Sequence, residues 1–221
     1  MKKLTALIIC IIMVIGFSSC NKADGGIEAE SGSLVFENAE KAYEEMTNAA
    51  ATGDFAKAVE CYKAGAADTE DADVMNWYFY SLAMAEYTEN GCVGYPLTIL
   101  EYNINGDFAL AKTASNELMM KVRDFNGIYE FEGSYLYIID GRIGIGVGQH
   151  LTGTVFCNAE VAIKDGKAYY AERKADGSHV FLYSIERDNN TIVMTALESN
   201  TQDMYSGTYS VSPAEYPELI Y

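Results

Sequence analysis

The sequence has little positive charge. Its 221 residues include 15 lysines and arginines against 32 aspartates and glutamates, which gives a formal net charge of −17 at pH 7. Because phosphate groups repel a chain this acidic, nucleic acids and anionic lipid surfaces are poor partners for it, and we predict no nucleic-acid binding. Both halves of the chain share the acidity, which is typical of a solubilising surface.

Motifs for metal binding and catalysis are also missing. The chain has two histidines, His150 and His179, and no CxxC or HExxH pattern. No Gly-x-Ser-x-Gly segment places a nucleophile beside a base. We therefore predict no metal site, no cofactor and no enzymatic activity, and we expect both histidines to be solvated.

The N-terminus carries the one long hydrophobic run. Lys2 and Lys3 precede an apolar stretch over residues 4–16, which is short for a membrane span, and Phe17-Ser18-Ser19-Cys20 follows. This pattern resembles a bacterial lipoprotein signal, although Phe17 stands where leucine is commonest. The resemblance implies a signal peptide over residues 1–19, cleavage before Cys20, and acyl chains such as palmitate on Cys20 that tether the protein to a membrane.

Residues 20–33 are small, polar and glycine-bearing, which predicts a flexible lipidated tether. In lipoproteins of this kind, an aspartate directly after the lipidated cysteine favours retention in the inner membrane, and here that residue is Asn21. The resemblance therefore implies a cell-envelope location on the outer membrane of a Gram-negative bacterium.

Three more cysteines, Cys61, Cys92 and Cys157, remain in the lipidated chain. They allow one disulfide at most, and Cys61 with Cys92 is the pair that falls within one apparent unit. A role as small buried hydrophobes suits all three better.

Apolar residues recur at helical spacing over residues 34–125, which predicts a helical domain of antiparallel hairpins. Turn and capping signals divide it into two helices that end near Gly53 and Gly65, a third from Val74 to about Thr88, a fourth from Pro96 to about Ile104, and a fifth opened by Asp107.

An acidic cluster precedes the third helix, at Asp68, Glu70, Asp71 and Asp73. Negative charge at a helix start offsets the macrodipole, so capping explains the cluster. A calcium loop is the alternative, but Asp73 stands where its glycine should be and Phe79 where its bidentate glutamate should be.

Two segments repeat in this domain, Gly53-Asp54-Phe55-Ala56 and Gly106-Asp107-Phe108-Ala109. Each resembles the start of the second helix of a tetratricopeptide repeat, but the spacing between the copies is longer than the usual 34 residues of that repeat. A degenerate tetratricopeptide-like repeat and an ordinary helical bundle therefore stay open.

After Gly127 the periodicity becomes alternating, in nine short runs separated by turns such as Asp140-Gly141 and Asp165-Gly166. These runs predict an antiparallel β-meander over residues 126–221 that forms a barrel or a sandwich, and closure favours the barrel. The overall class is therefore α+β. The Gly127-Ile128-Tyr129 segment and the Asp-Gly hairpins resemble those of small lipocalin-like barrels, with Tyr129 in place of the usual tryptophan. The glycines around Gly144 and Gly146 indicate a bare strand face and not a phosphate loop.

Tyrosine is abundant, with 17 in the chain. Aromatic rings with polar tips suit binding surfaces, and they also suit strands. We single out Trp77 and Tyr78 on the third helix, and Tyr135 and Tyr137 on one strand face, as candidate binding residues. The predicted function is that of a membrane-anchored lipoprotein whose helical domain acts as a protein-interaction or scaffold module. The alternative is a lipocalin-like small-molecule carrier with a tyrosine-lined barrel pocket.

Overall fold

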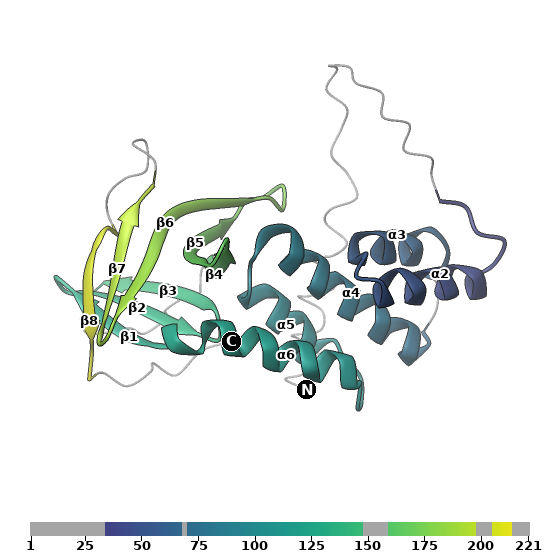
Figure 1. The fold of residues 1–221 in the computed structure, drawn as a ribbon, viewed down its shortest axis with the longest axis horizontal. Coiled ribbons are helices and arrows are strands. Elements are labelled where there is room, and N and C mark those ends of the chain that lie inside the picture. The colour runs from purple at the N-terminus through teal and green to yellow at the C-terminus, as the bar shows by residue number, and fades with distance from the viewer. Residues whose placement is uncertain (1–33, 68–69, 148–158, 198–204, 214–221) are drawn as a thin grey trace, which may run out of the picture.

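The structure is a computed structural model that describes residues 34–67, 70–147, 159–197 and 205–213. Helices come first and an antiparallel barrel follows, which confirms the α+β class (Figure 1). The predicted signal peptide and tether, with Cys20, lie outside the described residues. Within the described ranges, no helix is both long enough and apolar enough to span a membrane.

The helices are α2 (Ala39–Ala51), α3 (Phe55–Gly65), α4 (Ala72–Asn90), α5 (Gly94–Tyr102) and α6 (Ala109–Val122), followed by the 3-10 turn η1 (Arg123–Phe125). Asp54 caps α3 by accepting a hydrogen bond from the Lys57 amide. Asp71 caps α4 by accepting from the amides of Asp73 and Val74, so one member of the acidic cluster caps the helix as predicted.

The two Gly-Asp-Phe segments differ in their caps. Asp107 was expected to open its helix, but α6 starts one residue later than that role requires, and Asp107 instead pairs with Lys112 at 2.6 Å. The phenylalanines behave alike, because Phe55 and Phe108 both contact the ring of Tyr80 on α4, with ring centroids 5.8 and 5.9 Å apart. The phenylalanines of both repeated segments therefore pack against helix α4.

The barrel strands are β1 (Gly127–Phe131), β2 (Ser134–Ile139), β3 (Arg142–Val147), β4 (Ala159–Lys164), β5 (Lys167–Arg173), β6 (His179–Asp188), β7 (Thr191–Ala196) and β8 (Gly207–Val211). Each pairs with the next, and β1 pairs with β8, so the sheet closes and is not a sandwich. The predicted run at residues 154–156 lies outside the described residues. The hairpins turn through positive-φ residues such as Asp140 (φ 47°) and Asp165 (φ 51°), each followed by a glycine.

Strand β3 shows why its glycines alternate. In the register of β2 with β3, Tyr135 lies opposite Gly146 and Tyr137 lies opposite Gly144. A residue without a side chain leaves room beside each large ring. The glycine run therefore belongs to a strand, as predicted.

One apolar core runs from the helices into the barrel. Every strand contributes to it through residues such as Tyr129, Leu136, Ile192 and Tyr209, each at most 1% exposed, and helix α6 contributes Leu118. A side chain that lined a cavity large enough for water would keep some accessible area. Because these side chains keep almost none, they pack against one another. A second cluster, around Met46 and Cys61, joins α2, α3 and α4.

The connection between α4 and α5 enters the barrel wall. Among the described residues, strands β3 and β4 pair through Arg142–Glu160 and Ile143–Ala159. The Val161 amide donates to the Gly141 carbonyl just before β3, and β4 then extends past the start of β3 to Lys164. Residues 91–93 take the place of β3 there: the Ile163 amide donates to the Gly91 carbonyl, and the Val93 amide donates to the Val161 carbonyl. We call this stretch the seam segment. It brings a cysteine of the helical half onto the sheet.

Candidate functional site

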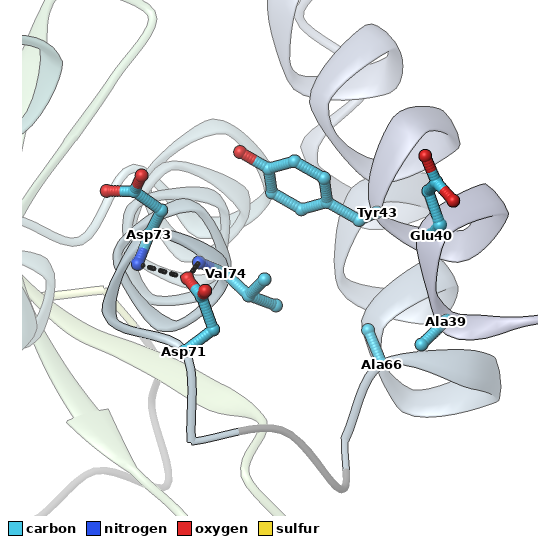
Figure 2. Close-up of a pocket in the computed structure, with 7 residues that line it drawn as sticks. All are labelled: Ala39, Glu40, Tyr43, Ala66, Asp71, Asp73 and Val74. Atoms are coloured by element: carbon cyan, nitrogen blue, oxygen red, sulfur yellow. Dashed lines mark hydrogen bonds between the residues drawn. The ribbon is translucent and has the colours of Figure 1, made fainter.

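A pocket opens between α2, the end of α3 and the first turn of α4. It has a volume of about 270 Å³ and is lined by Ala39, Glu40, Tyr43, Ala66, Asp71, Asp73 and Val74. Figure 2 shows the ring of Tyr43 reaching from α2 toward the start of α4, where Asp71 and Asp73 lie. We call it the acidic pocket.

The electrostatics of the acidic pocket favour a cation. Three of its lining residues, Glu40, Asp71 and Asp73, are acidic and solvent-exposed, and no lysine or arginine lines it. Burial, and then the carboxylates of Asp73 and Asp71, raise the pKa of the Tyr43 hydroxyl. A cationic group placed there would meet carboxylates and an aromatic ring together.

A second site lies beneath the surface, where the seam segment meets the sheet. Cys92 of that segment, Glu160 of β4 and His179 of β6 bring one sulfur, one carboxylate oxygen and one imidazole nitrogen within 4.8 Å of one another. The Cys92 residue is 0% exposed, and the side chains of Glu160 and His179 are 6% and 1% exposed. We call these three residues the buried cluster.

The Glu160 carboxylate is held from several sides. One oxygen accepts a hydrogen bond of 2.7 Å from the backbone amide of Tyr95 in the first turn of α5. The other lies 3.3 Å from Nε2 of His179 and 4.0 Å from the guanidinium of Arg173. Arg173 also bonds Glu86 at 3.1 Å and stacks on the Tyr95 ring at 3.9 Å. These contacts fix the carboxylate against both halves of the molecule.

The expectation that His179 is solvated is wrong. Its ring is buried, and although Nε2 lies at ion-pair distance from Glu160, neither ring nitrogen makes a hydrogen bond within the described structure. The reason is long-range: His179 starts strand β6, and Glu160 of β4 and the seam segment reach its ring from elsewhere in the chain. His150 lies outside the described residues.

The two described cysteines that follow the tether are free thiols in different surroundings. Cys61 packs in the helical cluster, as the hydrophobic role predicts, whereas Cys92 packs against Ala162 and Ala171 with Glu160 beside it. Burial, and then the Glu160 charge, raise the pKa of the Cys92 thiol. A thiol in this state is a poor nucleophile, so the buried cluster does not resemble the activated cysteine of a cysteine hydrolase.

The aromatic residues singled out as binding residues are packed. Tyr78 stacks on Tyr62 with centroids 3.9 Å apart, and Trp77 makes an edge contact with Phe108. Tyr135 and Tyr137 are 8% and 0% exposed and share a small cluster with a neighbouring isoleucine. The structure thus leaves little of the three tyrosine rings open to a ligand, whereas the ring that lines the acidic pocket is that of Tyr43 on α2.

Comparison with known proteins finds no relative. No protein-family model matches the chain, and no curated protein or solved structure matches it either. The lipocalin-like likeness is therefore one of architecture, a closed eight-stranded antiparallel barrel.

Proposed function

We propose that the protein is a lipid-anchored module of the cell envelope whose helical half binds a lysine- or arginine-bearing segment of a partner protein. The acidic pocket is the observation that carries this proposal, because it combines carboxylates, an aromatic ring and an opening to solvent. The lipoprotein signal predicted at Cys20 supplies the anchor.

The acidic pocket suits a side chain more than a whole folded surface. Its volume of about 270 Å³ matches one or two long side chains, which fits the insertion of a cationic anchor residue. The strong net negative charge would also speed the encounter with a basic partner at low salt.

The closed barrel is the architecture that the carrier alternative requires. Its described interior, however, is filled by side chains such as Leu136, Ile143 and Met194, each at most 1% exposed. A ligand would have to displace them, whereas the acidic pocket is already open. The interaction function is therefore the better supported.

Binding is tested by titration calorimetry with full-length protein in detergent and short lysine-containing peptides. Peptides in which the lysines are acetylated provide the ligand control, since acetylation removes the charge. We expect binding that needs the charge and that weakens at least tenfold in the double variant Glu40→Gln/Asp73→Asn.

The matched control is Glu60→Gln/Glu89→Gln, which removes the same charge from exposed helix positions that do not line the acidic pocket. Equal loss in both double variants would mean that overall charge, and not the acidic pocket, attracts the peptide. Lipidation is tested separately, by the intact mass of protein from native membranes and by its loss in Cys20→Ala.

A further inference from the structure

We propose that Cys92, Glu160 and His179 form a binding site for a divalent transition-metal ion of the zinc type. The site is independent of the partner-binding function. It rests on the convergence of three ligand types from three distant parts of the chain: the seam segment, β4 and β6.

The donor set suits zinc. Thiolate, imidazole and carboxylate are the three protein ligands that Zn²⁺ takes, with bonds of about 2.0–2.3 Å that place ligand atoms about 3.3–3.8 Å apart in a tetrahedron. The three atoms here already lie within 4.8 Å of one another. Side-chain rotations that move the ligand atoms by about an ångström would bring them to the distances that tetrahedral zinc requires. Calcium and magnesium, which prefer oxygen ligands, are disfavoured by the sulfur.

His179 gives independent support. Its side chain is 1% exposed, and both ring nitrogens lack hydrogen-bond partners within the described structure. Leaving buried polar atoms unpaired is costly, and such atoms are rare in folded proteins. A metal ion bound to one nitrogen satisfies that atom through its lone pair.

Charge balance also favours a divalent ion. A thiolate and a carboxylate carry two negative charges, which match one Zn²⁺. Arg173 lies 4.0 Å from Glu160, but its guanidinium is engaged by Glu86 and by the Tyr95 ring, so it acts as an outer partner of the carboxylate. The competing arrangement is a protonated His179 paired with Glu160 and no metal.

The ion would fasten the seam segment to the sheet. Cys92 lies between the two backbone hydrogen bonds that join this segment to β4. A metal bridge from Cys92 to β4 and β6 would therefore hold the helical half on the barrel wall.

The test uses full-length protein, stripped of metal with a chelator and then titrated with Co²⁺ or Zn²⁺. We expect one ion per chain by elemental analysis after dialysis, a thiolate-to-cobalt charge-transfer band, and a higher melting temperature with Zn²⁺. Cys92→Ser should abolish the band, and His179→Gln and Glu160→Gln should each weaken binding at least tenfold.

The controls are Cys61→Ser, which removes the buried thiol of the helical cluster, and Cys157→Ser. Both should keep the band. X-ray absorption of the wild-type zinc protein should show one sulfur neighbour, a result that does not depend on a variant that folds. Failure of the wild-type chain to retain Zn²⁺ or Co²⁺, or persistence of the band in Cys92→Ser, would overturn the site. Glu40→Gln/Asp73→Asn should retain metal, so failure here is separable from failure of peptide binding.

Discussion

The acidic pocket and the buried cluster both gather ionisable groups, but water reaches only the first. Glu40 and Asp73 are solvent-exposed, so their charges need no partner within the protein. Glu160 and His179 are enclosed, and each needs a partner to offset the loss of water. The contrast teaches that similar side chains have a small energetic role at the surface of this molecule and a large one at the junction of its halves.

The largest effect is expected from truncating the buried carboxylate. In metal-chelating buffer, Glu160→Ala should lower the free energy of unfolding by about 3–5 kcal/mol, because it leaves His179, Arg173 and the Tyr95 amide without their shared partner. Glu40→Ala should change it by less than about 0.5 kcal/mol. Urea denaturation measures both, and equal losses would remove the distinction between the two sites.

Two glycines, one in the seam segment and one in the exposed turn after α2, should differ in the same way. Gly91 has φ +70°, and an added Cβ would lie 2.3 Å from the Ile163 carbonyl oxygen, whereas Gly53 has φ +83° and open space around it. Gly91→Ala should therefore cost about 2–4 kcal/mol, from strain and clash together. Gly53→Ala should cost only the strain, about 1 kcal/mol. Denaturant midpoints compare the two, and a Gly53→Ala loss as large as that of Gly91→Ala would contradict the tight seam.

Alkaline pH should separate the enclosed tyrosines from Tyr43. Burial, then neighbouring tyrosines, raise the pKa of Tyr78 and of Tyr209 from 10.0 to about 12. Between pH 10 and pH 12 these tyrosines hold more protons in the folded chain than in the unfolded chain. Their contribution to the free energy of unfolding is therefore fully present below pH 10 and is lost as the pH rises toward 12. Chemical denaturation across this range checks the slope.

Tyr43 should respond to its carboxylates instead. Asp73 contributes to its raised pKa, so Asp73→Asn should bring that pKa closer to its usual value. The difference in tyrosinate absorbance between this variant and Asp73→Asn/Tyr43→Phe follows the Tyr43 titration alone. No change in its midpoint relative to the parent protein would show that Asp73 is too well screened to matter.

The smallest effect concerns the repeated helix starts. Asp54→Ala removes a cap whose oxygen accepts from the Lys57 amide and should cost about 1 kcal/mol. Asp107→Ala removes only an exposed ion pair and should cost less than Asp54→Ala. Thermal melting of the two variants gives the comparison, and a reversed order would mean that Asp107 supports α6 in another way.

What the sequence predicted well is what neighbouring residues decide. Alternating side chains and turns such as Asp140-Gly141 and Asp165-Gly166 placed the described strands, because a two-residue turn fixes both the partner and the register of its hairpin. Glycine endings and caps such as Asp54 placed the helices within a few residues. The helix after Asp107 shows the limit of such rules, since a shift of one residue replaced a cap with an ion pair.

The candidate sites were hidden because distant segments build them. The positions of Cys92, Glu160 and His179 in the sequence do not have the spacing of a metal-binding motif, and none of the three residues stands out from its neighbours when taken alone. They come together where the seam segment pairs with β4. The acidic pocket likewise joins Tyr43 of α2 to the start of α4. Asp71 and Asp73 were recognised as a capping cluster, but periodicity along α2 gave no sign that an aromatic ring lies beside them.

The barrel wall also has a consequence for the order of assembly. Because β4 hydrogen-bonds to residues 91–93 as well as to β5, the wall is completed by a piece of chain synthesised before any of the strands. The seam segment is therefore available for pairing with β4 before any strand of the sheet has been synthesised. A chain started at Asn126 would emerge with a row of amides and carbonyls on β4 left to water or to a neighbouring copy.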